Sequence, residues 1–208
     1  MDLRPHWSAV YQTKDPKHVS WYQPRPVASL RMIEAAGLEP GASILDVGGG
    51  ATHLVDHLLD AGYRHVGVLD IAPEALALAR DRLGDRAAAV EWFASDVLVF
   101  ESPHPWDLWH DRAAFHFLTD PDDQDRYREV LLRSLAPDGQ AVIATFGPEG
   151  PERCSGLPVQ RYDAERLAAE FAPDLSLIEH HLEAHTTPSG DEQEFLFARF
   201  VCSEGDIR

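Results

Sequence analysis

The sequence predicts an α/β fold: a doubly wound, mostly parallel sheet followed by a C-terminal antiparallel hairpin. From Ser43 onward, short apolar runs alternate with segments of helical periodicity, which is the pattern of successive βαβ units. Near the C-terminus this alternation stops. Residues 175–185 and 194–202 are strand-like, and the turn at 188–191, Pro-Ser-Gly-Asp, separates them. Two strands joined by such a turn are typical of a hairpin.

Each element of the parallel part has a recognisable beginning or end. The expected helices carry apolar residues at helical spacing and are bounded by proline, a capping residue or glycine. The expected strands are short apolar runs that stop at glycine, proline or an acid. In chain order the elements are a helix from Pro24 to Gly37, strand 44–47, a helix capped by Thr52 and ended by Gly62, strand 65–70, a helix from Pro73 to Gly84, strand 90–94, strand 106–110, helix 121–136, strand 141–146 and a helix capped by Asp163.

Two segments fall outside this alternation. Residues 147–162 are rich in glycine and proline and long for a loop, which makes them a functional candidate. Residues 1–23 are rich in aromatic side chains and precede the core. We expect a single domain over residues 1–208, in which 1–23 form an aromatic lid segment and 24–203 form the core.

Composition and charge exclude several classes of protein. The chain has 208 residues, 44% of them hydrophobic, which suffices for one sizeable core. Its formal net charge of −17 repels phosphate backbones, so nucleic acid is not an expected partner. The sequence has no long apolar run and no signal-like N-terminus, so we expect a cytoplasmic protein without a membrane partner, as a monomer or homodimer. The two cysteines have no metal-ligand spacing, and no metal is expected.

The most informative stretch is ILDVGGGATHL, residues 44–54, in which a buried strand leads through three glycines into a helix. Glycines let the backbone turn sharply and approach a ligand closely. The dinucleotide fingerprint G-x-G-x-x-G would need a third glycine where His53 stands. Asp46 precedes the glycines, and a carboxylate there disfavours pyrophosphate but favours a cationic sulfonium. We therefore expect such a ligand to be bound by Asp46, Gly48, Gly49 and Gly50.

Acids also end the next two predicted strands. Asp70 lies one βα unit after Asp46, where a carboxylate can accept two hydrogen bonds from ribose hydroxyls. Asp96 ends the third strand, where it and Val97 could line an adenine pocket. Any one of these acids could simply cap the following turn. Acids at three consecutive strand ends instead favour a ligand site, which we expect also to include Ile71.

These motifs resemble those of the class I S-adenosylmethionine-dependent methyltransferases. ILDVGGGAT resembles the family's D-x-G-x-G turn, VGVLDIAPEAL its acid-ended second strand and FASDVLVF its third-strand acid. LAPDGQAVIATF resembles the strand that follows its fourth helix, whereas Thr52 stands where many relatives have a further glycine. The resemblance implies a Rossmann-like class I methyltransferase fold and S-adenosyl-L-methionine as cofactor, with S-adenosyl-L-homocysteine as product.

The resemblance also implies that methyl transfer takes place beyond the fourth strand. The reaction is an in-line displacement, for which a protein supplies alignment and a dry site. A base is needed only where the acceptor loses a proton, and His110, Asp111 and His116 are candidates. We expect Asp111 to face the methyl group and, with His116, to be catalytic, although His116 could instead be a packed residue between two phenylalanines.

The remaining site residues surround this position. Aromatic faces attract cations, so the lid segment is expected to cover the sulfonium. We expect the cofactor to be contacted by His110, Trp7, Tyr11 and Trp21, and the acceptor by Tyr22, Arg112, Arg153 and Tyr162.

The acceptor itself is open to several interpretations. A small molecule is the leading one, because the lid segment and residues 147–162 could close a pocket around it. HWSAVYQ, VSWYQ and WDLWHDRAAFHFLTD also resemble the lysine methyltransferases that modify elongation factor or citrate synthase, although Asp111-Arg112-Ala113 replaces their Asp-Lys-Gly turn. A protein lysine methyltransferase is therefore the alternative, and it predicts an open groove. A catalytically inactive cofactor-binding protein is the third reading, and a dinucleotide oxidoreductase the last.

Overall fold

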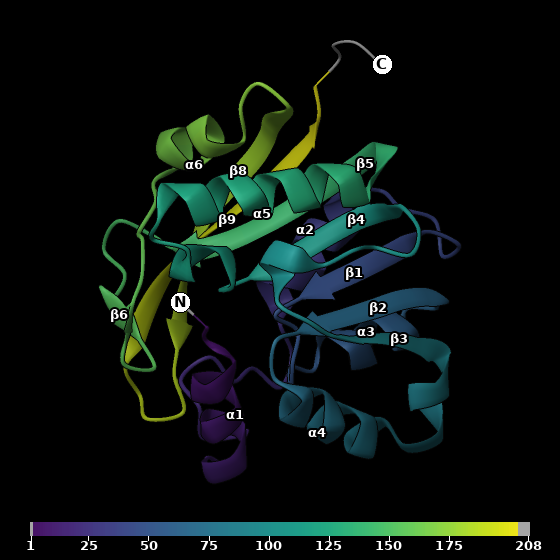
Figure 1. Cartoon of the computed structure of the whole chain (residues 1–208), viewed down its shortest axis with the longest axis vertical. Coiled ribbons are helices and arrows are strands. Elements are labelled where there is room, and N and C mark those ends of the chain that lie inside the picture. The colour runs from purple at the N-terminus through teal and green to yellow at the C-terminus, as the bar shows by residue number, and fades with distance from the viewer. Residues whose placement is uncertain (1, 204–208) are drawn as a thin grey trace.

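The computed structural model describes residues 2–203, which form a seven-stranded sheet in the order β3-β2-β1-β4-β5-β9-β8 (Figure 1). The first five strands in this order are parallel, whereas β9 pairs antiparallel with both β5 and β8. The predicted doubly wound sheet with a C-terminal hairpin is thus confirmed. The strands are β1 (Ser43–Val47), β2 (His65–Asp70), β3 (Val90–Ala94), β4 (Trp106–Arg112), β5 (Leu135–Phe146), β8 (Leu175–Thr186) and β9 (Glu192–Cys202).

Helices cover both faces of this sheet, and each face has its own apolar core. On one face, Ile33, Leu58 and Leu76 pack from α2 (Val27–Ala35), α3 (Leu54–Asp60) and α4 (Pro73–Leu83). On the other face, Tyr127 and Phe171 pack from α5 (Pro121–Ser134) and α6 (Ala164–Phe171). Short 3-10 turns η1 (Gly84–Ala89), η2 (Val97–Val99) and η3 (Phe115–Phe117) complete the connections.

The N-terminal helix α1 (Arg4–Thr13) is attached to the surface of α4 and does not belong to either core layer (Figure 1). Two side chains of α1 make this contact: Ser8 Oγ and Gln12 Nε2 both donate to the Glu74 carboxylate at 2.8 Å. Glu74 lies in the first turn of α4, where a negative charge is favourable. The contact holds the aromatic segment beside the sheet.

Most expected elements are present with ends shifted by a few residues, and two of these shifts have a clear physical cause. Residue His53, not Thr52, precedes α3 at the cap position, because the Thr52 hydroxyl donates to Asp46 (3.4 Å). Strand β5 begins at Leu135 rather than at 141, because Leu135 already pairs with Trp106 across an irregular register. Segment 147–162 contains a small hairpin of β6 (Arg153–Cys154) and β7 (Leu157–Pro158).

The parallel pairing brings the carboxyl ends of the central strands to one edge. Asp46 of β1 is opposite Val68 of β2 on one side and His110 of β4 on the other. The chain leaves β1 toward β2 and later returns to β4, so β1 and β4 flank the point where strand order reverses. Open α/β sheets bind their ligands beside this point.

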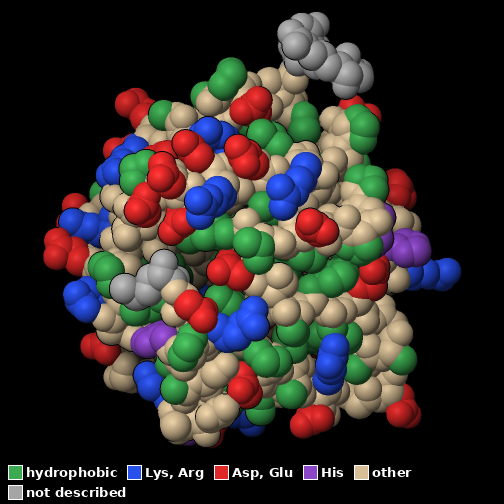
Figure 2. Space-filling view, in the orientation of Figure 1, with side chains coloured by type: hydrophobic (Ala, Val, Ile, Leu, Met, Phe, Trp, Pro, Cys, Tyr) green, Lys and Arg blue, Asp and Glu red, His purple; other side chains and the backbone are tan. Residues whose placement is uncertain are grey.

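The surface carries both signs of charge. On the face shown in Figure 2, acidic and basic side chains are interspersed over the helices. None of the helices within residues 2–203 combines the length and apolar character needed to cross a bilayer.

Candidate active site

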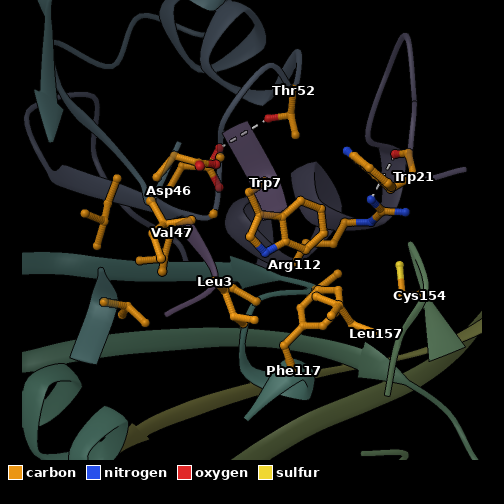
Figure 3. A pocket seen from close by; sticks show the side chains of 18 of the residues that line it. Leu3, Trp7, Trp21, Asp46, Val47, Thr52, Arg112, Phe117, Cys154 and Leu157 are labelled. Atoms are coloured by element: carbon orange, nitrogen blue, oxygen red, sulfur yellow. Dashed lines mark hydrogen bonds between the residues drawn. The ribbon is translucent and has the colours of Figure 1, made fainter. Parts of the chain in front are cut away.

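A cavity of about 520 Å³ opens at the carboxyl ends of β1, β2 and β4. Its walls come from the glycine turn after β1, from the N-terminal segment and from the β6–β7 hairpin (Figure 3). Fourteen of the residues predicted to form the site line this cavity: Trp7, Tyr11, Trp21, Tyr22, Asp46, Gly48, Gly49, Asp70, Ile71, Asp96, Val97, His110, Arg112 and Arg153. Most of the residues predicted for the site therefore line one cavity.

The glycine turn packs tightly against β2. Gly48 and Gly50 have φ values of +65° and +40°, a region that favours glycine. Gly48 N–H donates to the Leu69 carbonyl (2.8 Å). A Cβ atom at Gly50 would lie 2.6 Å from Asp70 Oδ2. The turn thus brings its backbone against the acid that ends β2, although Gly50 itself is not among the cavity-lining residues.

The three strand-end acids have different surroundings. Asp70 is buried and its Oδ1 accepts the Ala72 N–H (2.8 Å), while Asp96 Oδ1 accepts the Leu98 N–H (2.9 Å). Each acid therefore also caps its own turn, as the alternative interpretation expects. Burial raises the pKa of Asp70 to about 7, against the lowering effect of the Ala72 N–H, and the Asp46 carboxylate raises it further.

Asp46 and His110 form a buried pair at the centre of the site. His110 Nδ1 lies 2.7 Å from Asp46 Oδ1, and both side chains are almost completely shielded from solvent. A carboxylate only accepts hydrogen bonds, so the proton of this contact belongs to Nδ1. Nε2 of His110 is buried and meets no partner among residues 2–203. The pair therefore presents a lone pair of an oriented imidazole beside the cavity.

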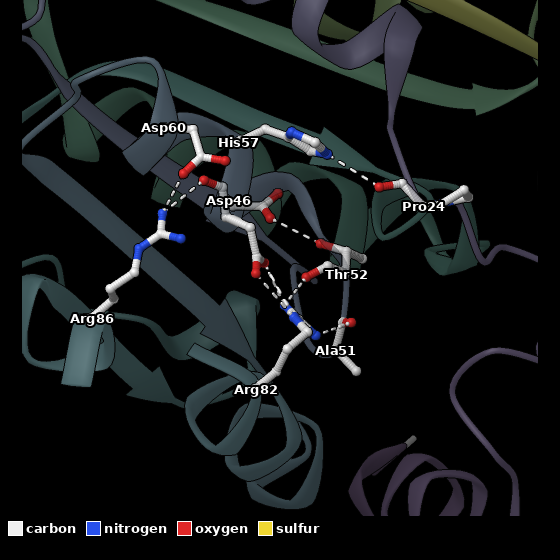
Figure 4. Close-up of polar contacts among 9 residues, drawn as sticks. Pro24, Asp46, Ala51, Thr52, His57, Asp60, Arg82 and Arg86 are labelled. Carbon is white, nitrogen blue, oxygen red and sulfur yellow. Dashed lines mark hydrogen bonds and ion pairs between the residues drawn. The ribbon is translucent and has the colours of Figure 1, made fainter. Parts of the chain in front are cut away.

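Arg82, which the sequence did not single out, braces the glycine turn from outside (Figure 4). Its guanidinium donates to the carbonyls of Ala51 (2.9 Å) and Thr52 (2.5 Å) and pairs with the Asp56 carboxylate (2.7 Å). It approaches from α4, far along the chain from the turn. A sequence alone does not show which arginine of a helix reaches such carbonyls.

Replacing Arg82 with methionine is expected to lower the free energy of unfolding by about 1–3 kcal/mol, because hydrogen bonds from a charged group to the turn are lost. The substitution should also weaken S-adenosylhomocysteine binding about three- to tenfold, because the carbonyls of the glycine turn lose the hydrogen bonds that fix their position. Chemical denaturation and calorimetric titration measure the two effects. Arg86→Met is the matched control, because Arg86 pairs with Asp60 on the exposed surface. Equal effects of the two substitutions would contradict a specific role for Arg82.

The N-terminal aromatic residues close one side of the cavity. Trp7 lies edge-to-face with Trp21 and Phe117, at ring-centre distances of 5.8 and 5.1 Å. Tyr11 packs edge-to-face on Trp21 at 6.3 Å. Burial, and then the Asp70 charge, raise the pKa of Tyr11, so its hydroxyl stays protonated. These contacts place the predicted lid segment over the site.

The structure contradicts the positions expected for Asp111 and His116. The Asp111 carboxylate points to the opposite face of β4, where it accepts from Tyr127 Oη (2.6 Å) and from the N–H groups of Ala114 and Phe115. His116 is fully buried outside the cavity, and its Nδ1 accepts the Phe146 N–H (3.2 Å). Neither residue lines the cavity.

The surroundings of these two groups explain the corrections. Burial raises the pKa of Asp111 to about 6 against the lowering effect of its hydrogen bonds, and it lowers the pKa of His116 to about 3. His116 is therefore neutral at physiological pH and packs as the alternative interpretation expected. Tyr162 is a further correction: it is buried under Phe115, outside the cavity, and its hydroxyl accepts from Gln124 (3.0 Å).

Acids at the ends of adjoining parallel strands, around a glycine turn at the switch point, form a ligand site of the kind that open α/β sheets use for nucleotide-like ligands. No group of metal-ligating side chains occurs within residues 2–203. Residues 44–139 match the sequence model of a family described as a methyltransferase domain, and the sheet as a whole has the class I methyltransferase fold.

Individual relatives are distant. The chain is 28% identical over 116 residues to the ubiquinone/menaquinone biosynthesis C-methyltransferase UbiE of Vibrio parahaemolyticus, an alignment that covers 55% of this chain and 45% of that protein. The chain thus aligns with less than half the length of this curated relative.

Two solved structures share the fold over nearly the whole chain. One is the 1,6-didemethyltoxoflavin-N1-methyltransferase of Burkholderia thailandensis, with bound 1,6-didemethyltoxoflavin and S-adenosylhomocysteine (TM-score 0.71, 20% identity, 97% of this chain and 88% of that chain). The other is the N-methyltransferase NodS of Bradyrhizobium japonicum in complex with S-adenosylhomocysteine (TM-score 0.73, 19% identity, 98% and 100%).

Proposed function

We propose that this chain transfers a methyl group from S-adenosyl-L-methionine to a small-molecule acceptor held in the cavity. The observation that carries this proposal is the division of the cavity into two parts. Its acid-lined part lies at the ends of β1, β2 and β3, and its apolar part is enclosed by the N-terminal segment and the β6–β7 hairpin. The acid-lined part suits a positively charged sulfonium cofactor, and the apolar part suits a compact acceptor.

The residues of the acidic part fit the cofactor. Asp70 Oδ1 is engaged by the Ala72 N–H, and no donor of residues 2–203 bonds Oδ2, which stays available to ribose hydroxyls. The glycine turn lets a ligand approach the backbone, and a side chain at Gly50 would fill this space. Asp46 supplies negative charge at the end of β1 for the ammonium of the methionine moiety. These features support S-adenosyl-L-methionine rather than a dinucleotide.

When bound, the cofactor supplies an electrophilic methyl group on a sulfonium. The protein's part is to align the acceptor with this methyl group and to exclude water. Trp7, Trp21 and Phe117 provide an apolar wall that excludes water from the site. His110 Nε2 is placed to accept a proton from an acceptor that must lose one, and Asp46 stabilises the imidazolium that results.

Cavity closure favours a small acceptor over a protein side chain. Residues 2–23 act in this proposal as a lid on the core, because α1 is fixed to α4 and Arg112 donates to the Trp21 carbonyl (3.2 Å). A protein lysine methyltransferase needs an open groove for a chain segment. The relative that is crystallised with 1,6-didemethyltoxoflavin acts on a small molecule, which supports the same choice.

The experiment is incubation of the purified chain with cofactor labelled in the methyl group, together with a metabolite panel or a cell lysate. Label in small molecules is the expected result. Label in a protein band would support the lysine methyltransferase alternative. Binding of S-adenosylhomocysteine without transfer to either pool would indicate an inactive cofactor-binding protein.

Cofactor affinity is expected to fall as pH is lowered below about 7. The raised pKa of Asp70 means that its carboxyl is protonated below this value and charged above it. Ribose hydroxyls donate to the charged form, so binding weakens up to about tenfold per pH unit on the acid side. Calorimetric titration with S-adenosylhomocysteine at several pH values measures this change in affinity. The series runs from about 1.5 pH units below to about 1.5 pH units above the pKa of Asp70. An Asp70→Asn variant should bind weakly with a much flatter profile, and an equally steep profile in it would assign the titration to another group.

A further inference from the structure

Arg112, the last residue of β4, carries a guanidinium with unused hydrogen-bond donors in the cavity wall (Figure 3). Its Nη1 donates to the Trp21 carbonyl (3.2 Å), and its Cζ lies 4.5 Å from the centre of the Phe195 ring. Nε and Nη2 are buried and meet no hydrogen-bond acceptor in the described part of the chain. Arg112 also forms no ion pair with a carboxylate of residues 2–203.

Such an arrangement is costly unless a ligand completes it. A buried charge without a partner destabilises the folded chain, and unpaired buried donors add to this cost. Burial lowers the pKa of Arg112 to about 10, so the group still carries its charge at neutral pH. Nε and Nη2 lie on one edge of the guanidinium, where their N–H bonds are parallel and match the two oxygens of a carboxylate.

The position of this edge separates it from the cofactor part of the cavity. The acids for the adenosyl group end β1, β2 and β3, whereas Arg112 stacks on Phe195 of β9. Arg112 itself ends β4, which is adjacent to β1, but its side chain extends to Phe195 of β9, three strand steps from β1 or roughly 14 Å at about 4.8 Å per strand. The other groups that act on the guanidinium are the Trp21 carbonyl, the Glu183 carboxylate of β8, Cys154 of the β6–β7 hairpin and, more weakly, Asp46, and neither carboxylate forms an ion pair with it.

The rest of this compartment is apolar. Trp7, Phe117 and Leu157 line it together with Phe195 (Figure 3). The basic side chains of the lining are Arg112 and Arg153, and Arg153 is exposed and bonded to the Gly156 carbonyl. A ligand for this compartment therefore needs an apolar body and one planar anionic group.

We infer that the methyl acceptor is a small, largely apolar molecule bearing a carboxylate, which Arg112 binds in bidentate fashion through Nε and Nη2. This inference rests on the proposed function and names the substrate class for it. Arg112 orients the acceptor at the end opposite the acids, and its contact with Trp21 ties that orientation to the closed lid.

The test compares acids with their uncharged counterparts. Calorimetry with the whole chain, saturated with S-adenosylhomocysteine, measures binding of 2-aminobenzoate, 4-hydroxybenzoate and phenylacetate and of the three corresponding carboxamides. Acids are expected to bind about tenfold or more tightly than amides, since a charged, bidentate contact is roughly twice as strong as a neutral one. Arg112→Gln should weaken acid binding by about tenfold or more and leave amide binding within about threefold.

Further variants separate this contact from other effects. Arg112→Lys keeps a point charge without the fork and should retain part of the preference for acids; it also serves if Arg112→Gln does not fold. Arg86→Gln removes an exposed arginine and should change the affinity for neither the acids nor the amides. The affinity for S-adenosylhomocysteine should change much less than the affinity for acids in all variants, because Arg112 forms no ion pair with the strand-end acids of residues 2–203.

Three results would overturn the inference. The first is that no acid binds to the wild-type complex, and the second is that amides bind as well as acids. The third is a loss of S-adenosylhomocysteine affinity in Arg112→Gln that equals the loss for acids, since Arg112 would then hold the carboxylate of the cofactor. Arg112-dependent binding of acids without methyl transfer to any of them would instead count against the proposed function and leave the anion site established.

Discussion

Replacing Gly50 with alanine is expected to weaken S-adenosylhomocysteine binding by about 10- to 100-fold. The added Cβ would lie 2.6 Å from Asp70 Oδ2 and 3.0 Å from the Tyr11 hydroxyl oxygen. Asp70 cannot easily yield, because its Oδ1 holds the Ala72 N–H at the start of α4. Loss of hydrogen bonds to a charged carboxylate costs about 1.5–3 kcal/mol, which corresponds to this range of affinity. Calorimetric titration measures it.

Backbone strain must be separated from this steric effect. Gly50 has a positive φ, and so does Gly62 (+93°), but a Cβ at Gly62 would meet nothing within 4 Å. Gly62→Ala is therefore the matched control. It should cost about 1–2 kcal/mol of stability and leave cofactor affinity unchanged. If the two variants lost affinity equally, strain rather than contact with Asp70 would explain the effect.

Local sequence patterns predicted the fold because the central parallel strands β1, β2 and β4 are buried on both faces. The apolar runs at 65–70 and 90–94 coincide with β2 and β3. The pattern failed where tertiary pairing decided the boundary. Leu135 becomes part of β5 through its pairing with Trp106, although Pro137, Asp138 and Gly139 follow it and indicate a break.

The error at Asp111 has a simple geometrical origin. Successive side chains of a strand point to opposite faces, so His110 and Arg112 share one face of β4 and Asp111 takes the other. Applying this alternation to the predicted strand would have selected His110 and rejected Asp111. Arg82 could not have been found in this way, because its contacts with the turn depend on how α4 packs and not on a local pattern.

For an acceptor that loses a proton, replacing His110 with alanine is expected to lower kcat by about 100-fold or more. General base catalysis by a positioned side chain contributes about 10²- to 10⁴-fold. His110 satisfies the geometry for this role, since Asp46 holds Nδ1–H at 2.7 Å and leaves Nε2 unpaired beside the cavity. The measurement is single-turnover methyl transfer with saturating cofactor. The rate should fall in the variant while its affinity for S-adenosylhomocysteine stays within about threefold of the wild-type value.

A structural role for His110 would give a different result. If the imidazole only supported the glycine turn through Asp46, His110→Ala would weaken S-adenosylhomocysteine binding and leave the single-turnover rate at saturating cofactor nearly unchanged. Asp46→Asn tests the same pair from the other side, because an amide no longer enforces Nδ1–H and the imidazole can turn its proton toward the acceptor. His65→Asn, exposed at the amino end of β2, is the neutral control. Because kcat and cofactor affinity respond separately, catalysis by His110 and support of the glycine turn by Asp46 and His110 can be assigned independently.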